Sequence, residues 1–205
     1  MFLAKNRPTV TTMLKSDTPE AALAEIEQIR SIGTDTFGMQ IDYLKPEYRT
    51  LPVVKRILDA MDGTPCYVTN YRGGDPNADD EMLAETLLAA ADYGKVLLDL
   101  RCDMFDPREG EYTEDQTAVS KQKAFIRAAH AKGAEVLMST HIFGRFVPKE
   151  EVKRIARAAA ERGADISKIV TTANSEDELQ QNLELVAEVK RELPIPFLFL
   201  CNGSH

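Results

Sequence analysis

The chain has 205 residues, of which 43% are hydrophobic and 28% charged, as is typical of one globular domain with a sizeable core. Its formal net charge of −8 and pI near 5.0 argue against nucleic acid or an anionic membrane as the partner. No apolar run approaches the ~20 residues that cross a bilayer, and residues 1–8 lack the apolar stretch of a signal peptide. We therefore expect a cytoplasmic protein that binds neither membrane nor nucleic acid.

The cysteines and histidines form no recognisable disulfide or metal-binding pattern. Cys66, Cys102 and Cys201 lie far apart, each in or beside an apolar run, and no Cys-x-x-Cys pair occurs. This usage indicates buried free thiols in a reducing compartment. The three histidines lack the spacing of metal ligands, so we expect neither a metal nor another cofactor.

In chain order, apolar runs of strand length alternate with amphipathic stretches of helix length. Thr18-Pro19-Glu20 places a capping residue, a first-turn proline and an acid at the start of the first helix. Ser175 and Glu178 form a capping-box pattern before the last helix. The expected strands are 9–14, 36–43, 66–70, 96–100, 135–141, 163–170 and 196–200. The expected helices are 18–32, 50–61, 81–93, 117–132, 148–162 and 175–189.

The spacing of these elements indicates the architecture. Regular alternation is typical of parallel βα units, which build either an open doubly wound sheet or a (β/α) barrel. A doubly wound nucleotide binder should carry G-x-G-x-x-G after its first strand, whereas this chain has Lys15-Ser16-Asp17-Thr18. A polar segment, 105–114, follows the fourth strand and is longer than most strand-to-helix loops. We predict a single (β/α) barrel domain over residues 1–205.

A lysine lies in the middle of the sixth strand. The stretch from Gly163 to Val170 is β-branched and apolar around Lys168, as in a strand covered on both faces. Burying an ammonium is costly, so Lys168 either extends to water or is a neutral amine held as a nucleophile for a carbonyl. The preceding strand ends in His141, which is either a hydrogen-bonded structural residue or a general acid/base beside that amine.

In a (β/α) barrel the active site lies at the carboxyl ends of the strands, and every second residue of a strand points inward. His141 and Lys168 then converge on one cavity if both point inward. By the same alternation the other inward candidates are Gln40, Asp42, Thr69, Tyr71, Asp99, Arg101, Ser139, Val170 and Thr172.

Two segments resemble type I 3-dehydroquinate dehydratase: Ser139-Thr140-His141 with Phe143 and Pro148 after it, and the stretch from Gly163 to Ile169. The resemblance runs loosely along the whole chain, and these segments are its specific part. It implies a (β/α)8 TIM barrel of the shikimate pathway, and hence of aromatic amino acid biosynthesis. It also implies that Lys168 forms an imine with the substrate ketone and that His141 moves protons as 3-dehydroquinate becomes 3-dehydroshikimate.

The chemistry of the two residues supports the same reaction independently. An imine acidifies the neighbouring C–H bond because its cationic nitrogen accepts the electron pair that the proton leaves behind. A base then removes that proton, and a β-hydroxyl leaves as water. Lys168 must be neutral to attack the ketone, and an imidazole such as His141 suits proton transfer near neutral pH.

The residues expected to bind the substrate depart from the family pattern. Family members place Glu and Arg on the second strand, where this chain has Gly38 and Gln40, and Arg at the position of Tyr71. The family's Glu-Gly-Gly corresponds at best to Arg72-Gly73-Gly74, so a carboxylate of the site is expected to be lost, and Arg101 replaces an acid on the fourth strand. Arg72 should point outward unless the glycine turn after it swings it over the barrel mouth. We assign substrate binding to Arg101, Arg72, Gln40, Tyr71 and Ser139.

The family pattern continues past the segment that Pro196 to Gly203 resembles, with an eighth strand and a final helix that this sequence lacks. Seven strands would leave two unpaired edges, and unpaired edges promote association. We therefore expect a longer natural chain, or a second chain over these edges, most simply in a homodimer.

Two other functions stay open. A class I aldolase-like carbon–carbon lyase would use the same lysine, and its products would distinguish it. A catalytically silent relative would bind a small acidic metabolite or a protein partner. The intact Lys168 and His141 argue against the silent relative, and the altered second and third strands argue for it.

Overall fold

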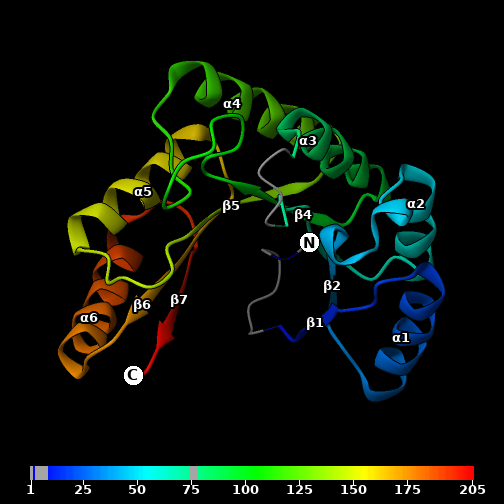
Figure 1. Ribbon diagram of the computed structural model, residues 1–205, viewed down its shortest axis with the longest axis horizontal. Helices are drawn as coiled ribbons and strands as arrows, with labels where there is room; N and C mark the ends of the chain where they lie inside the picture. Colours follow the sequence, from blue (N-terminus) through cyan, green and yellow to red (C-terminus); the bar gives the residue numbers. More distant parts are fainter. Residues whose placement is uncertain (1, 3–8, 74–77) are drawn as a thin grey trace. The chain divides into compact units, whose positions relative to one another are not determined.

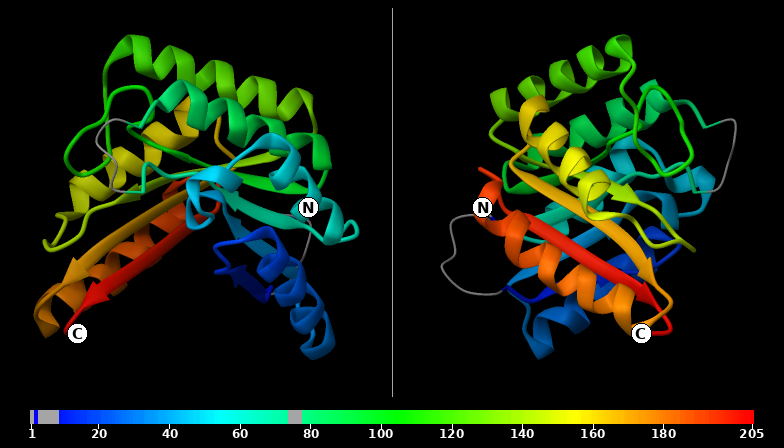
Figure 2. Two further views of the ribbon diagram at one scale, coloured as in Figure 1. Left: turned by 45° about the vertical axis from the view of Figure 1, so that its right-hand side comes forward. Right: turned by 90° about the vertical axis from the view of Figure 1, so that its left-hand side faces the viewer.

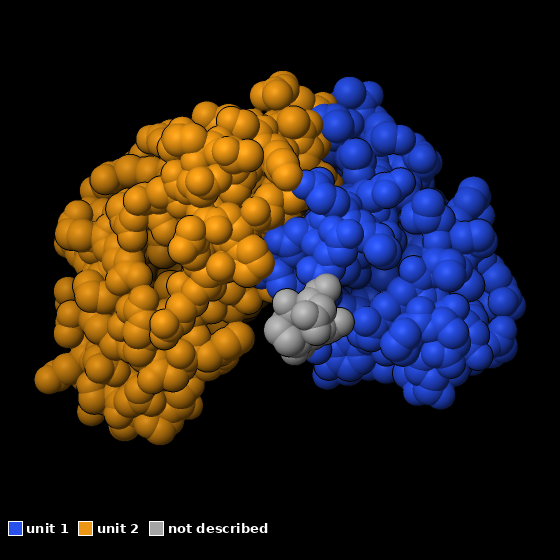
Figure 3. Space-filling model, turned by 45° about the horizontal axis from the view of Figure 1, so that its top comes forward, with its two compact units in different colours: residues 1–99, 128–135 blue, residues 100–127, 136–205 orange. Residues whose placement is uncertain are grey.

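The structure is a computed structural model that describes residue 2 and residues 9–73 and 78–205 (Figure 1). Gly74, the second glycine of the turn expected after Arg72, lies outside the described residues. The chain divides into two compact units, one of residues 1–99 and 128–135 and the other of residues 100–127 and 136–205 (Figure 3).

The first unit is built on parallel strands that are hydrogen-bonded in sequence order. Its strands are β1 (Thr11–Leu14), β2 (Thr36–Gln40), β3 (Cys66–Thr69) and the first four residues of β4 (Val96–Arg101). Its helices are α1 (Pro19–Ile32), α2 (Leu51–Ala60) and α3 (Asp80–Ala89), with 3₁₀ turns η1 (Ile41–Tyr43), η2 (Pro46–Tyr48) and η3 (Ala90–Tyr93). Phe37, Val68, Leu98 and Ile57 are fully buried, and burial of such a side chain stabilises the fold by ~1.5–3 kcal/mol.

The second unit contains the end of β4 and three further parallel strands, with helices α5 and α6 on one face of β6 and β7 (Figure 2). Its elements are α4 (Gln116–Ala131) up to residue 127, β5 (Glu135–His141) from residue 136, α5 (Lys149–Arg162), β6 (Ile166–Ala173), α6 (Glu176–Glu192) and β7 (Phe197–Gly203). Gly203 has φ +123°, and a Cβ there would lie 2.1 Å from the carbonyl oxygen of Ala173. Only glycine therefore fits the last position of the β6–β7 ladder. The parallel α/β class predicted from the sequence is confirmed.

The helix signals in the sequence are confirmed near both ends of the chain. The Thr18 hydroxyl accepts a hydrogen bond from the Ala21 amide at 3.3 Å and caps α1. The Ser175 hydroxyl accepts from the Glu178 amide at 3.2 Å, while the Glu178 carboxylate accepts the backbone N–H of Asn174 at 2.7 Å. In the usual capping box the glutamate accepts the N–H of the N-cap residue itself, whereas here it accepts the N–H of the residue before the N-cap.

Among the element boundaries that differ from the prediction, those after β2 and α3 change the type of secondary structure. The strand expected over 36–43 ends at Gln40 because the chain turns into η1, so strand alternation does not apply to Asp42. The Asp42 carboxylate accepts the backbone N–H of Tyr71 at 3.1 Å. Burial raises the pKa of Asp42, and that hydrogen bond opposes the rise. The helix expected over 81–93 ends at Ala89 and continues as η3, which stops at Gly94 with φ +86°.

Cys66 and Cys102 are buried free thiols, as expected, whereas Cys201 is partly exposed on β7. Burial raises the pKa of the Cys66 thiol. Across the described part of the chain, no helix combines the length and the apolar character needed to span a membrane.

Candidate active site

Lys168 and His141 lie on neighbouring parallel strands and share one face of the sheet. In the register of β5 with β6, Ser139 is the partner of Lys168, and His141 is the partner of Val170. Partners in a parallel ladder point to the same side, as does every second residue along each strand. The side chains of Ser139, His141 and Lys168 therefore point to the same face, as strand alternation predicts.

This face points away from helix α6. Strand β7 continues the register, with Cys201 as the partner of Thr171. The Asn182 side chain of α6 donates a hydrogen bond to the Cys201 sulfur at 3.4 Å, so Cys201 and Thr171 point toward the helix. Lys168 has the opposite parity and points to the other side. It is half-buried.

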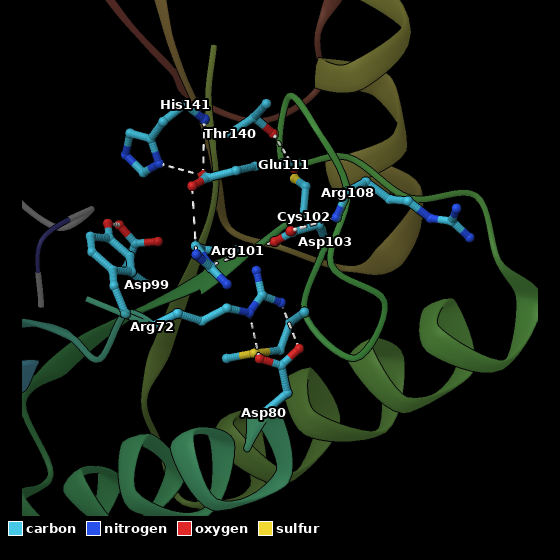
Figure 4. A network of polar contacts seen from close by, with 12 residues as sticks. Arg72, Asp80, Asp99, Arg101, Cys102, Asp103, Arg108, Glu111, Thr140 and His141 are labelled. Carbon is cyan, nitrogen blue, oxygen red and sulfur yellow. Dashed lines mark hydrogen bonds and ion pairs between the residues drawn. The ribbon is translucent and has the colours of Figure 1, made fainter. Parts of the chain in front are cut away.

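The His141 imidazole is held by a carboxylate from the segment between β4 and α4. The Glu111 Oε2 atom lies 2.7 Å from Nδ1 of His141 and accepts the backbone N–H of the same histidine at 3.1 Å (Figure 4). The hydroxyl of buried Thr140 donates to the Glu111 carbonyl oxygen at 3.4 Å. Phe143 stacks on the histidine ring, with 6.0 Å between the ring centroids. The imidazole is therefore fixed by contacts on several sides.

Arg101 lies on the other side of the Glu111 carboxylate (Figure 4). Its Nη1 atom is 3.5 Å from Oε1 of Glu111, and its Nε atom is 3.5 Å from Oδ1 of Asp103. The side chains of Arg101 and Asp103 are only 8% and 1% exposed. A buried guanidinium between two carboxylates satisfies the rule that buried charges are paired.

Gln40 and Tyr71 belong to the first unit. Gln40 of β2 is in register with Thr69 of β3, and Thr69 with Asp99 of β4, so these side chains share one face. The Tyr71 hydroxyl donates to Asp99 Oδ2 at 2.7 Å, and the Tyr67 hydroxyl contacts the same oxygen. Burial, together with the nearby carboxylate, raises the pKa of Tyr67 well above its ordinary value, so this phenol stays a protonated donor.

Arg72, the other arginine proposed as a substrate anchor, makes a two-pronged ion pair within the first unit. Its Nε and Nη2 atoms lie 2.7 and 2.6 Å from the two carboxylate oxygens of Asp80, the first residue of α3. Both side chains are mostly buried, at 12% and 10% exposed. Arg72 would therefore contact a substrate acid only by sharing or exchanging this partner.

The chemistry of the second unit is that of an amine and an imidazole with its own carboxylate partner. Such a pair can form an imine with a ketone and move a proton on the neighbouring carbon. Among the described residues, no group of three or more His, Cys, Asp or Glu side chains is arranged to hold a metal ion.

Comparison with known proteins decides the family. The model of the type I 3-dehydroquinase family matches residues 10–205. The chain belongs to this family. It is 26% identical over 199 residues to the 3-dehydroquinate dehydratase of Listeria monocytogenes serotype 4b (strain F2365), covering 93% of the chain and 73% of that protein. The enzyme of Aromatoleum aromaticum is 21% identical over 206 residues, 97% of the chain and 74% of that protein. A shorter match to the enzyme of Alkaliphilus oremlandii is 33% identical over 83 residues, 40% of the chain and 32% of that protein.

Solved structures of type I 3-dehydroquinases share the fold. The 3-dehydroquinate dehydratase of Geobacillus kaustophilus superposes with a TM-score of 0.80 at 19% identity, over 97% of this chain and 75% of that one. The Clostridium difficile enzyme, solved with covalently modified comenic acid, gives a TM-score of 0.81 at 19% identity, over 98% and 77% of the two chains. At this identity the likeness concerns the fold.

The departure from the dehydroquinase pattern at Gly38 has a structural counterpart. A Cβ built on Gly38 would lie 1.9 Å from the sulfur of Met13 on the neighbouring strand β1. The Met13 side chain therefore fills the space that a larger residue at position 38 would need. The family's glutamate could not be restored here without moving Met13.

The loss of the Glu-Gly-Gly carboxylate after the third strand stays a prediction, and a carboxylate from a different segment contacts His141. Arg72-Gly73 does not supply the acid, but Glu111 places a carboxylate on His141 from another part of the chain. Sequence reasoning missed Glu111 because strand alternation says nothing about residues in a loop. The available signal was the length of segment 105–114, since unusually long loops in compact domains are often functional.

Proposed function

We propose that Lys168 and His141 carry out the dehydration of 3-dehydroquinate to 3-dehydroshikimate. Family membership identifies the reaction as that of a carbon–oxygen lyase of the shikimate pathway. The assignment of roles is supported by the shared face of the two residues on β5 and β6.

In the proposed reaction the neutral amine of Lys168 attacks the substrate ketone and, after loss of water, forms a protonated imine. The imine nitrogen accepts an electron pair as a proton leaves the neighbouring carbon. His141 is the acid/base that takes this proton or protonates the β-hydroxyl as it leaves as water. Hydrolysis of the imine then releases the product and restores Lys168. Ser139, the ladder partner of Lys168, is proposed to contact the substrate, as are Gln40 and Tyr71.

Borohydride trapping with 3-dehydroquinate tests the lysine and the substrate together. Reduction of the imine should add one reduced substrate to the intact mass, and peptide mapping should place the adduct on Lys168. A class I aldolase-like lyase would also be trapped, but its products would show carbon–carbon cleavage. A folded protein that forms no adduct with 3-dehydroquinate and does not dehydrate it would contradict the proposal.

Replacing the two candidate arginines with methionine tests what holds the substrate acid. A carboxylate in a low-dielectric cavity needs a charged donor such as a guanidinium. We expect Arg101→Met or Arg72→Met to raise KM, with a loss of ~1.5–3 kcal/mol for a charged hydrogen bond. Arg108→Met is the control, because the Arg108 side chain is 59% exposed in the segment after β4. Steady-state kinetics unchanged in both variants would place the anchor elsewhere.

We also propose that the parallel sheet belongs to a (β/α)8 barrel, in one domain over residues 1–205. The regular βα order supports this assignment, as does the greater length of the structural relatives, of which the chain covers 75–77%. The free cysteines and the pathway support a cytoplasmic location.

A homodimer formed through the edge of β7 is a further part of the proposal. Strand β7 pairs with β6, and among the described residues of its unit no strand pairs with its other edge. Leu198 and Leu200 of β7 are 42% and 43% exposed, and apolar edge strands favour association.

Light scattering should give twice the chain mass of 22.8 kDa, and Leu200→Asp should give monomers. Leu183→Asp on α6, where Leu183 is 60% exposed, should leave the dimer intact. A monomeric parent protein would refute the proposal.

A further inference from the structure

We propose that Glu111 is the positioning residue that fixes the tautomer and orientation of the His141 imidazole. The inference rests on the proposed function only in taking His141 as the acid/base of the reaction. It assigns a role to the segment between β4 and α4, which otherwise has none in the reaction.

The contacts of Glu111 determine which ring nitrogen carries the proton. An ionised carboxylate is acceptor-only, so the 2.7 Å contact between Glu111 Oε2 and His141 Nδ1 places the proton on Nδ1. The same oxygen accepts the backbone N–H of His141 at 3.1 Å, which fixes the carboxylate relative to the strand as well as to the ring. Nε2 is then left as the atom that exchanges protons with the substrate.

A carboxylate fits the position of Glu111 better than an amide would, because both of its oxygens must act as acceptors. Oε1 faces Arg101 Nη1 at 3.5 Å, so one oxygen faces two donors on His141 and the other faces a cation. In a glutamine, the amide NH₂ would have to face either the guanidinium or the N–H groups of His141. With the NH₂ toward Arg101, the oxygen still accepts from His141 but without its charge, and with the NH₂ toward His141 the Nδ1 proton is displaced. Glu111→Gln should therefore weaken the preference for the Nδ1 tautomer despite its matching shape.

The segment that carries Glu111 is pinned at both ends by buried side chains. Arg162 of α5 donates to the Cys102 carbonyl at 3.0 Å and to the Thr113 carbonyl at 2.6 Å. Gln122 of α4 donates to the same Cys102 carbonyl at 3.1 Å. Arg162 is 6% exposed and Gln122 is fully buried. A carboxylate held by such supports is preorganised for its task.

The backbone at Glu111 points to the same role. Glu111 has φ +48°, a left-handed conformation that glycine adopts without strain and that a glutamate adopts rarely. The contacts of its side chain with His141 and Arg101 explain why this residue stands at a strained position.

The experiment compares Glu111→Gln and Glu111→Asp with Glu109→Gln. Glu109 is an exposed acid of the same segment, so its replacement makes the same charge change away from His141. Glu111→Asp keeps the charge but withdraws the carboxylate by one methylene. Nitrogen NMR of the imidazoles at alkaline pH reads the tautomer directly, and the chain has only three histidines to assign. Thermal melts check that each variant is folded, and kcat and borohydride trapping are measured alongside.

We expect His141 to be protonated at Nδ1 in the parent and in Glu109→Gln, and to show a weaker preference for Nδ1 in both Glu111 variants. The value of kcat should then fall by at least about 10–100-fold, the scale known for carboxylates behind metal-bound histidines, while trapping at Lys168 persists. An unchanged tautomer in the Glu111 variants would overturn the inference, whatever happens to kcat, and so would unchanged kcat with a changed tautomer. If the parent neither traps nor dehydrates 3-dehydroquinate, the proposed function fails while the NMR result still decides whether Glu111 orients His141.

Discussion

Replacing Lys168 with alanine is expected to abolish both turnover and covalent trapping of 3-dehydroquinate. The imine nitrogen is the electron sink of the proposed reaction, and removal of the amine leaves no group in that role. After borohydride treatment, the intact mass of Lys168→Ala should equal that of the untreated variant, and dehydration should not exceed the uncatalysed rate. Lys168 is half-buried, so the variant should fold, which a thermal melt would check.

The matched control for this experiment is Lys190→Ala, because Lys190 is an exposed lysine on α6. This variant should form the adduct and turn over like the parent. An adduct on another lysine in the Lys168→Ala protein would show that the nucleophile has been assigned wrongly.

Replacing His141 with alanine is expected to slow turnover by ~10²–10⁴-fold, the usual contribution of a general acid/base. Trapping should persist, because attack on the ketone belongs to Lys168 and only the later proton transfer needs the imidazole. The two variants therefore separate imine formation from elimination. Steady-state kinetics and intact mass measure the two effects in one set of samples.

His130→Ala provides the control, since His130 is an exposed histidine on α4 that is assigned no part in the reaction. It should leave turnover unchanged. A His141→Ala enzyme with nearly full activity would mean that another group moves the protons.

The sequence by itself was sufficient to predict the parallel α/β fold and the relation between Lys168 and His141. Both depend on periodicities that the backbone imposes wherever it is regular. The two-residue alternation of a strand puts His141 and Ser139 on one face, and the same rule applied to β6 selects Lys168. Capping at Thr18 was equally readable, because it involves residues within one helical turn.

The same rule failed where the backbone left the strand. Asp42 was placed inward by alternation, but the chain turns at Ile41–Tyr43 and the Asp42 carboxylate bonds to the Tyr71 amide instead. A short polar side chain can satisfy a backbone group of another segment, and no local pattern records that partner.

Only the tertiary structure brought Glu111 to His141 and paired Arg72 with Asp80. Glu111 lies 30 residues from His141 in the sequence. It is in a loop with a positive φ angle, where no regular repeat predicts the direction of a side chain. Its position depends on Arg162 and Gln122, which hold the loop from two helices. Strand periodicity can identify the amine and the imidazole, but the carboxylate that completes them is placed by packing between distant segments. The local sequence shows that the loop is long, but not which residue the loop brings to His141.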